Sequence, residues 1–531
     1  MPGVIAAGNS QTVAAGAAIL EQGGNAVDAA VAAAFTSFIA EVGVVHIGGS
    51  GLAQIFDPAS SHHRVYDFFS NMPGLGRSAM PKNLDFQRVT IDYGATRQDF
   101  YLGRGSVAVP GNVYGLCRLA ADYGRLPLDI LLQPARHLAE QGAMLDKFQA
   151  DTCELLRPLY THTKGMRAIF THHGHMVRAG DVVRIPHLET TLAALANEGV
   201  RLMREGWLSS AILADQKQRG GLLTEDDLKR YEVLREAPIR LKYRDFEVIL
   251  PPPSSTGGVL TAFTLKLVAH FEVVRMEHGS AAHLRLLFEA LAATSRARPY
   301  WEKAVAERPW QDAVDYFLSD RLIAPFLDEM SRALQEEAPS PAAKEPPGPQ
   351  STSHLSVIDG EGMAVALTTT AGESAGYVVP QTGFIPNNIL GEEDLNPAGF
   401  HQWQAGQRIF TMMTPAIVMR DGRIRLVTGS GGSNRIRSAI LQVLVNVLDF
   451  EMPLEAAVNA PRVHVEDGVM QCEYGYDPDA VDELERLGYS INRWTTRSIY
   501  FGGAHSVALE NDGKLVGAGD DRRGGAVATI G

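Results

Sequence analysis

A proline-rich stretch at residues 336–351, EEAPSPAAKEPPGPQS, divides the chain into two parts of different character. Prolines and small polar residues replace the periodic apolar residues that precede the stretch, which indicates an exposed linker. Before the linker, the spacing of apolar residues predicts helices, for example at 26–40, 259–268 and 283–296. After it, alternating apolar residues predict strands. The chain must therefore combine a helix-rich part with a strand-rich part that begins directly after a flexible tether.

The first element predicted after the linker is a β-hairpin. Residues 352–359, TSHLSVID, and residues 363–370, MAVALTTT, flank the turn sequence GEG. If the residues on either side of the turn pair without a bulge, Thr352 lies opposite Thr370. Opposed residues of antiparallel strands have Cα atoms roughly 4.5–5.5 Å apart and side chains on one face, so the two hydroxyls could exchange a hydrogen bond. A row of threonines on a solvated strand face would show the same pattern.

The position of Thr352 at the end of the linker favours a chemical role. Cleavage between Ser351 and Thr352 would expose a free α-amine beside the hydroxyl of the same residue. An α-amine has a pKa of roughly 7.7–8.0, so near neutral pH it can be the base that activates a poor hydroxyl nucleophile. If the bond between Ser351 and Thr352 were cut, Thr352 would therefore hold a complete pair of nucleophile and base within one residue.

Length, charge and cysteine usage exclude several classes of protein. The 531 residues exceed the roughly 250–300 at which a single core stops growing, so two domains or one large layered core are expected. The formal net charge of -13 provides no positive field for nucleic acid. Three widely spaced cysteines fit neither a disulfide framework nor a zinc site. With no signal-peptide pattern and no membrane-spanning apolar stretch, the sequence predicts a cytoplasmic protein without membrane contact.

Three further motifs carry weaker signals. The glycines of residues 46–52, HIGGSGL, follow a predicted helix and precede a predicted strand, which is the reverse of a dinucleotide-binding unit. The histidines of residues 171–175, THHGH, have no carboxylate or cysteine at ligand spacing, which favours surface histidines over a metal site. Residues 520–523, DDRR, predict an ion-paired turn at the surface. Neither a metal nor a cofactor is predicted.

Blocks of sequence along nearly the whole chain point to one family. They are GGNAVDAA at 23–30, VPG at 109–111, YG at 123–124 with QPA at 133–135, PPSSTGG at 252–258, TSHLSVID at 352–359, NAPRVH at 459–464 and GAGDDR at 517–522. In this order they resemble the γ-glutamyltranspeptidase family of N-terminal nucleophile hydrolases. The nucleophile motif of that family is a threonine, then Thr or Ser, His, an aromatic or apolar residue and Ser-Val-x-Asp.

The resemblance implies an α+β fold, namely a four-layer αββα sandwich. It also implies a precursor that cleaves itself before Thr352. The products would be a large subunit, residues 1–351, and a small catalytic subunit, residues 352–531, which remain associated.

Catalytic roles follow from the resemblance residue by residue. Thr352 would be the nucleophile, and Thr370 would be the hydroxyl that supports its amine, in agreement with the hairpin register. The oxyanion would be stabilised by backbone N–H groups of Gly431 and Gly432. An ungapped alignment instead places this pair at Gly432 and Ser433. No Gly-x-Ser-x-Gly motif occurs in this segment, so an α/β-hydrolase mechanism is not indicated.

The residues that recognise the substrate in this family are only partly matched. The arginine that holds the α-carboxylate matches Arg97, and a serine pair matches Thr411 and a methionine. The acid that faces the α-amino group matches Glu392. However, Gly372 and Ile389 stand where the family has Asn and Gln.

The sequence therefore predicts an autoprocessed acyltransferase or amidohydrolase that needs no cofactor. Its substrate would be a γ-glutamyl, glutathione-type or related small-molecule amide, and its acceptor water or an amine. One alternative is a cephalosporin-acylase-like or small-amide amidohydrolase with an altered acyl pocket. Another is a non-catalytic binding protein on the same fold. Assembly into a homo-oligomer stays open.

Overall fold

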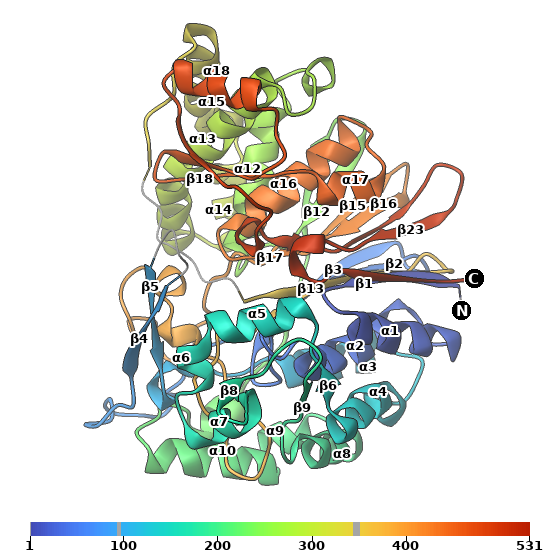
Figure 1. Cartoon of the computed structure of the whole chain (residues 1–531), viewed down its shortest axis with the longest axis vertical. Coiled ribbons are helices and arrows are strands. Elements are labelled where there is room, and N and C mark those ends of the chain that lie inside the picture. Colours follow the sequence, from blue (N-terminus) through green and yellow to red (C-terminus); the bar gives the residue numbers. More distant parts are fainter. Residues whose placement is uncertain (1, 93–96, 344–350) are drawn as a thin grey trace.

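The fold consists of four layers, two β-sheets face to face with helices on the outer face of each (Figure 1). The computed structural model describes residues 2–92, 97–343 and 351–531. The αββα sandwich that the resemblance implied is confirmed. The larger sheet contains strands from both sides of the linker, with the two strands of the predicted hairpin between two strands that precede the linker, so the two predicted segments build one shared core.

The larger sheet, called sheet I, is antiparallel throughout. Its strand order is β10 (Leu234–Glu236), β3 (His62–Phe68), β2 (Ser50–Asp57), β14 (Ala364–Thr370), β13 (Ser353–Asp359), β1 (Gly3–Ala7) and β24 (Ala526–Ile530). Sheet II is also antiparallel, in the order β11 (Ile239–Tyr243), β12 (Phe246–Leu250), β15 (Ala416–Arg420), β16 (Arg423–Thr428), β22 (Ser506–Leu509) and β23 (Leu515–Ala518).

The outer helical layers differ in chain origin. Below sheet I in Figure 1 lie helices from the first half of the chain, among them α1 (Ser10–Glu21), α2 (Ala26–Ala40), α3 (Asn112–Tyr123), α4 (Leu128–Gln141) and α8 (Leu188–Glu198). Above sheet II lie α12 (Thr256–Val268), α13 (Ala281–Glu307), α16 (Arg435–Leu448) and α17 (Leu454–Asn459). The first of the predicted helices, 26–40, is confirmed with the same bounds, whereas α13 extends well beyond the predicted 283–296.

The remaining helices and strands are mostly shorter, apart from α10 and α15. The helices are α5 (Lys147–Leu155), α6 (Arg157–Tyr160), α7 (Lys164–Phe170), α9 (Arg201–Arg204), α10 (Trp207–Gln218), α11 (Glu225–Lys229), α14 (Trp310–Phe317), α15 (Asp320–Glu336), α18 (Pro478–Arg486), and the 3-10 turns η1 (Arg104–Ser106), η2 (Val273–Arg275), η3 (Ile389–Gly391), η4 (Glu393–Leu395), η5 (Ile499–Phe501) and η6 (Asp521–Arg523). The strands are β4 (Gln87–Asp92), β5 (Arg97–Leu102), β6 (Ala143–Met144), β7 (Thr171–His172), β8 (His175–Met176), β9 (Val182–Val183), β17 (Ser430–Gly431), β18 (Val463–Glu466), β19 (Val469–Cys472), β20 (Ser490–Arg493) and β21 (Gly503–Ala504).

Apolar side chains fill all three interfaces between the layers. Between the two sheets, β-branched and small residues such as Val4, Ile249, Ile358, Ile417 and Val427 form a thin core. Larger cores lie between each sheet and its helices. Helix α2 is buried on every side because alanine dominates its sequence, which allows neighbouring helices to approach closely. Within the described residues, no helix combines the length and apolar character needed to cross a membrane.

The predicted hairpin register is confirmed. Strands β13 and β14 pair from Ser353 opposite Thr369 to Ile358 opposite Ala364, without a bulge. The predicted linker begins where α15 ends, and its described part up to residue 343 is largely exposed. Residues 344–350 lie outside the described residues. Ser351 is again inside the fold and buried.

Candidate active site

The predicted nucleophile lies at the start of a central strand of sheet I. Thr352 is 7% exposed and immediately precedes β13. The hydroxyl of Thr370, at the end of β14, donates a 2.7 Å hydrogen bond to the carbonyl oxygen of Ser351. In the uncut chain the Thr370 hydroxyl thus contacts the carbonyl of the bond that is predicted to break. Because the nitrogen of Thr352 is still a peptide nitrogen, the predicted contact with a free amine belongs to the cut form.

The other residues of the nucleophile motif hold the hairpin in place. The Asp359 carboxylate accepts hydrogen bonds from the backbone N–H groups of Ala26, at the start of α2, and of Met363, across the turn. His354 bridges two hydroxyls of sheet I, with Nδ1 2.8 Å from Thr368 Oγ1 and Nε2 2.9 Å from the Ser356 hydroxyl. Burial lowers the pKa of His354 well below its usual value, so the ring is neutral. These contacts show that Asp359, His354 and Ser356 of the motif stabilise the hairpin that carries Thr352.

The glycine-rich loop lies directly against Thr352. Gly431 ends the short strand β17, and a Cβ atom at this position would come within 2.0 Å of the Thr352 carbonyl oxygen. Gly432 has a φ of 122°, which favours glycine. Ser433, the alternative member of the oxyanion pair, instead donates its hydroxyl to Asp394 at 2.7 Å. The structure therefore brings Gly431 to the predicted nucleophile, and the oxyanion role of Gly431 and Gly432 stays a prediction.

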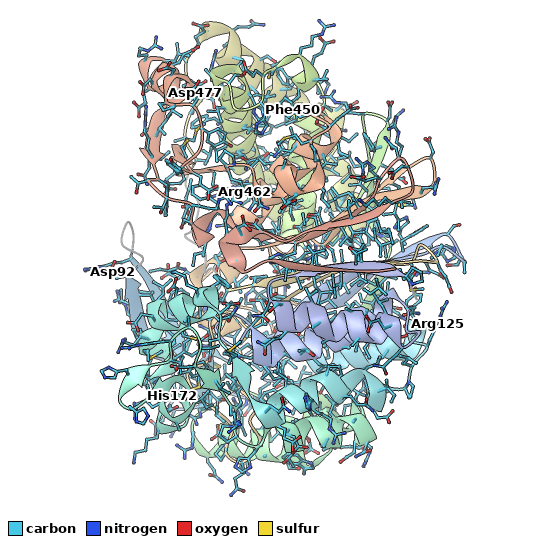
Figure 2. The ribbon with its side chains drawn as sticks, turned by 45° about the vertical axis from the view of Figure 1, so that its right-hand side comes forward. Asp92, Arg125, His172, Phe450, Arg462 and Asp477 are labelled. Atoms are coloured by element: carbon cyan, nitrogen blue, oxygen red, sulfur yellow. The ribbon has the colours of Figure 1, made fainter. Side chains whose placement is uncertain are left out.

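Residues 520–523 form ion pairs as the sequence predicted, but apart from the exposed Asp521 they are buried and do not form a surface turn. Asp520 is fully buried, and its carboxylate accepts from the Ala504 N–H at 2.9 Å and pairs with Arg462 at 2.7 Å. Figure 2 shows Arg462 inside the fold. Burial alone would raise the pKa of Asp520, but Arg462 and Arg522 hold it below its usual value. The predicted surface placement was wrong for Asp520 and Arg522, because these charges find buried partners far away in the sequence, such as Glu473 for Arg522.

The last residue of this segment reaches the predicted nucleophile. Arg523 donates from Nη1 to the carbonyl oxygen of Thr352 at 3.2 Å and from Nη2 to the carbonyl oxygen of Ile499 at 3.2 Å. Burial, with a contribution from Arg435, lowers the pKa of Arg523 to about 10, so its side chain is still a cation at neutral pH. Sequence reasoning missed Arg523, although it directly follows the GAGDDR block that carried part of the family resemblance.

A buried acidic cluster lies beside the end of β14. Glu392 is 1% exposed, and neither of its carboxylate oxygens has a hydrogen-bond partner among the described residues. Burial raises its pKa well above the usual value, and the charges of Asp394 and Glu373 act in the same direction. Gly372 allows this close packing, because a Cβ atom there would lie 2.2 Å from Glu392 Oε1. The predicted substrate residue Glu392 therefore belongs to the surroundings of Thr370.

Two predicted substrate residues are not brought into contact with Thr352. Arg97 begins β5, its side chain is 75% exposed, and its Nε donates to Asp92 at 2.9 Å. Figure 2 shows Asp92 at the outer edge of the molecule. Thr411 is buried, and its backbone pairs with that of Ser255 at the start of α12. Their roles in substrate binding stay predictions.

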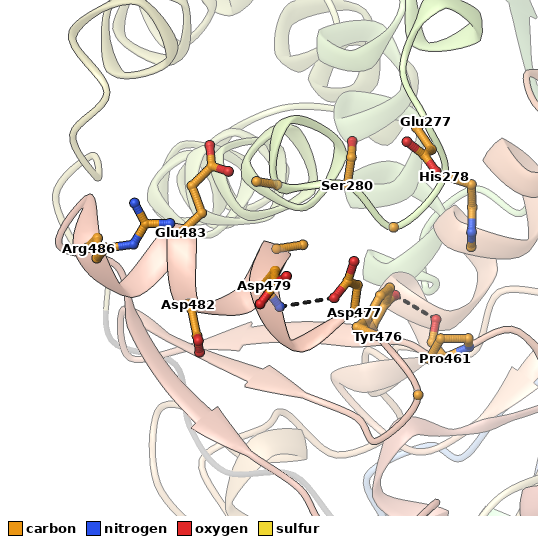
Figure 3. A pocket seen from close by; sticks show the side chains of 14 residues that line it. Glu277, His278, Ser280, Pro461, Tyr476, Asp477, Asp479, Asp482, Glu483 and Arg486 are labelled. Carbon is orange, nitrogen blue, oxygen red and sulfur yellow. Dashed lines mark hydrogen bonds between the residues drawn. The ribbon is translucent and has the colours of Figure 1, made fainter.

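One hollow of the described surface lies away from Thr352. A cavity of about 670 Å³ separates the start of α13 from α18, and Asp477, Asp479 and Asp482 are among the acids that line it (Figure 3). Within it, Tyr476 donates its hydroxyl to the carbonyl oxygen of Pro461 at 2.6 Å. None of the predicted site residues lines this cavity. Its size alone therefore does not connect it with the chemistry of Thr352.

Glu41, which follows the end of α2, supports the residue after the nucleophile. Its carboxylate accepts hydrogen bonds from the hydroxyls of Ser353 at 2.5 Å and Thr12 at 2.8 Å. Burial raises the pKa of Glu41 to about 7 despite these hydrogen bonds, and the charge of Asp146 adds to the rise. Glu41 lies far from Ser353 in sequence, so no local pattern indicated this contact.

The raised pKa of Glu41 predicts a pH-dependent stability. The unfolded carboxyl loses its proton near pH 4.5, whereas the folded one keeps it up to about pH 7. Between these values the free energy of unfolding falls by about 1.4 kcal/mol per pH unit, or about 3 kcal/mol in total. The contribution is thus fully present below pH 4.5 and lost as the pH rises through 7. Because glutamine does not titrate, we expect Glu41→Gln to remove this fall in the free energy of unfolding between pH 4.5 and 7.

Unfolding midpoints in denaturant between pH 4.5 and 8 would test this prediction. The protein with Glu41→Gln and the protein that keeps Glu41 should both carry Thr352→Ala, so that every molecule is uncut. The difference in stability between these two proteins should change by about 3 kcal/mol across the range. Parallel stability curves would show that Glu41 does not hold its proton as the burial implies.

Comparisons with known proteins find similarity along nearly the whole chain. The family model of gamma-glutamyltranspeptidase matches residues 12–530. The chain is 33% identical over 536 residues to the acylase ACY 1 proenzyme of Pseudomonas sp. (strain SE83), covering 99% of this chain and 93% of that protein. It is 28% identical over 541 residues to the glutathione hydrolase proenzyme of Escherichia coli (strain K12), covering 98% and 90%.

The fold agrees with a solved structure. The cephalosporin acylase from Bacillus halodurans superposes with a TM-score of 0.84 at 23% sequence identity, covering 99% of this chain and 95% of that one. Because the family model spans residues 12–530, the chain belongs to the γ-glutamyltranspeptidase family.

Proposed function

We propose that the chain cuts itself before Thr352 and then acts as an N-terminal threonine amidohydrolase and acyltransferase. The observation that carries this proposal is the surroundings of the peptide between Ser351 and Thr352. The Thr370 hydroxyl contacts the Ser351 carbonyl at 2.7 Å, and the Gly431 backbone packs against the Thr352 carbonyl. The Thr370 hydroxyl thus lies where the Ser351 carbonyl would need support when the Thr352 hydroxyl attacks it, and the Gly431 backbone lies next to the nucleophile.

The proposed turnover uses only groups of the cut chain. The free α-amine of Thr352 takes the proton of its own hydroxyl, which attacks the amide carbonyl of the substrate. Backbone N–H groups of Gly431 and Gly432 stabilise the oxyanion, and the amine passes the proton to the leaving amine. Water or an acceptor amine then resolves the ester. The two segments would stay associated because β13 pairs with β1 and β14 with β2.

A γ-glutamyl amide is the substrate class that the acidic cluster favours. The buried Glu392 carboxylate has no hydrogen-bond partner among the described residues, so an ammonium group on the acyl part would supply donors and a counter-charge. Arrival of the ammonium would lower the pKa of Glu392 and leave both groups charged. The name of the Escherichia coli relative, glutathione hydrolase, agrees with this class.

A second candidate is an acylase that takes a carboxylate-bearing acyl group without an ammonium. Gly372 and Ile389 provide none of the side-chain amides that the family has at these positions. The similarity to the acylase of Pseudomonas sp. (strain SE83), 33% identity, also favours this candidate. The two candidates share the same chemistry at Thr352 and differ only in the acyl group.

Release of aniline from two matched anilides separates the candidates. γ-Glutamyl-anilide and glutaryl-anilide differ only in the ammonium group. If Glu392 binds that group, kcat/KM for the glutamyl compound should be about tenfold higher or more, and Glu392→Gln should remove most of the preference. A preference for glutaryl-anilide would instead favour the acylase. If neither amide nor any related amide were cleaved by the cut protein, the proposed function would be wrong.

A further inference from the structure

We propose that Glu373 is a positioning residue for self-cleavage, because it holds the residue whose carbonyl is attacked. This inference rests on the proposed function, in which the chain cuts itself before Thr352. The backbone N–H of Ser351 donates to Glu373 Oε1 at 3.2 Å, and the Ser351 hydroxyl donates to Glu373 Oε2. One carboxylate therefore binds two donors of the same residue.

Together with Thr370, this carboxylate fixes every polar group of Ser351. The side chain is held by Glu373, the backbone N–H by Glu373 and the carbonyl oxygen by Thr370 at 2.7 Å. On the other side of the bond, Arg523 donates to the Thr352 carbonyl oxygen at 3.2 Å. The peptide that breaks is thus held on both sides by side chains that belong to neither of its two residues.

Glu373 itself is rigidly placed. It is 1% exposed, and its backbone N–H donates to Asn388 Oδ1 at 2.7 Å. Gly372, with a φ of 65°, makes the turn that carries the chain from the end of β14 into this position. A cavity of only about 10 Å³ borders Ser351, Glu373 and Arg523, so bulk water does not surround these hydrogen bonds. Hydrogen bonds in such surroundings are stronger than those at the surface.

The chemical step shows what the positioning achieves. The Thr352 hydroxyl oxygen bonds to the Ser351 carbonyl carbon, the bond from that carbon to the Thr352 nitrogen breaks, and the hydroxyl proton ends on that nitrogen. Water then hydrolyses the ester, which restores the Thr352 hydroxyl and gives Ser351 a carboxylate. Before the step, Glu373 keeps the carbonyl from turning away from the hydroxyl.

Rates of self-cleavage in full-length chains would test this role. Newly synthesised protein from cell-free translation can be followed by denaturing electrophoresis for wild type, Glu373→Gln, Ser351→Ala and the double variant. We expect Glu373→Gln to slow cleavage about tenfold or more, because glutamine cannot accept both donors of Ser351. Glu393→Gln, which changes an exposed carboxyl close by in sequence, is the matched control and should cleave like wild type.

A comparison of the double variant with Glu373→Gln and Ser351→Ala alone shows whether Glu373 acts by positioning Ser351 or whether its loss damages the fold in general. If Glu373 acts through Ser351, Ser351→Ala slows the wild-type chain but has a much smaller effect in the Glu373→Gln chain. Glu373→Asp, which keeps the charge, should recover part of the rate. Independent, multiplying effects would overturn the proposal, and so would wild-type cleavage by Glu373→Gln. An uncut wild-type chain would instead contradict the proposed function, whatever the Glu373 variants do.

Discussion

Replacing Thr352 with alanine is expected to leave the chain in one piece and without amidase activity. The wild-type chain should yield fragments of 351 and 180 residues, about 38 and about 19 kDa of the total 57.5 kDa. The alanine variant lacks both the hydroxyl that attacks the Ser351 carbonyl and the nucleophile of turnover. Activity should therefore fall by about a thousandfold or more. Denaturing electrophoresis and an anilide assay on the same samples measure both effects.

Thr352→Ser is the matched control for this prediction. Serine keeps the hydroxyl and, after cleavage, an α-amine, so the chain should still be cut and retain activity, although more slowly. If Thr352→Ala were cut at the same place as wild type, cleavage would come from another protein. If wild type and Thr352→Ala were both uncut and equally inactive, a non-catalytic binding protein on this fold would be the better account.

Gly431→Ala should have the second largest effect. A Cβ atom at this position would lie 2.0 Å from the carbonyl oxygen of Thr352 and 2.9 Å from Nη1 of Arg523. The carbonyl oxygen of Thr352 is a backbone atom, so it cannot move away from the added methyl group unless Thr352 itself moves. Displacement of reacting groups by about 1 Å can cost roughly a hundredfold in rate, so cleavage should slow by about that factor. Overpacking should also lower the free energy of unfolding by about 1–3 kcal/mol.

Gly165→Ala provides the control for an added methyl group. Gly165 lies in α7, has no positive φ, and its Cβ atom would meet only Val378 Cβ, at 3.8 Å. This variant should be cut at the wild-type rate and be equally or slightly more stable, because alanine favours helices. The time course of cleavage and the thermal unfolding midpoint compare the two variants. Normal cleavage in Gly431→Ala would show that the glycine loop does not constrain Thr352.

The hairpin at the nucleophile could be predicted from sequence because its determinants are local. A three-residue turn between two alternating strands sets the register, and the pairing of Ser353 with Thr369 follows from it. The same reasoning placed Thr352 next to Thr370, and the structure adds that the Thr370 hydroxyl contacts the Ser351 carbonyl. The four-layer arrangement was instead predicted from the family resemblance, because the periodicity of apolar residues does not show how two sheets stack.

The groups that surround the bond could not be predicted from sequence. Glu41 and Arg523 meet residues 352–353 only through the tertiary fold, from opposite ends of the chain. Residues 520–523 have the composition of a surface turn, and only distant partners such as Arg462 make their burial favourable. Glu373 lies close to Thr370 in sequence, but its contact with Ser351 depends on the turn at Gly372.

The N-terminal residue of the small fragment is the most direct test of the account. Purified wild-type protein is separated by denaturing electrophoresis, and the fragment of about 19 kDa is analysed by N-terminal sequencing and intact mass. The account predicts a single sequence that begins at Thr352 with Thr-Ser-His-Leu. An intact chain, or a fragment that begins at any other residue, would contradict the claim that Thr352 becomes the N-terminal nucleophile.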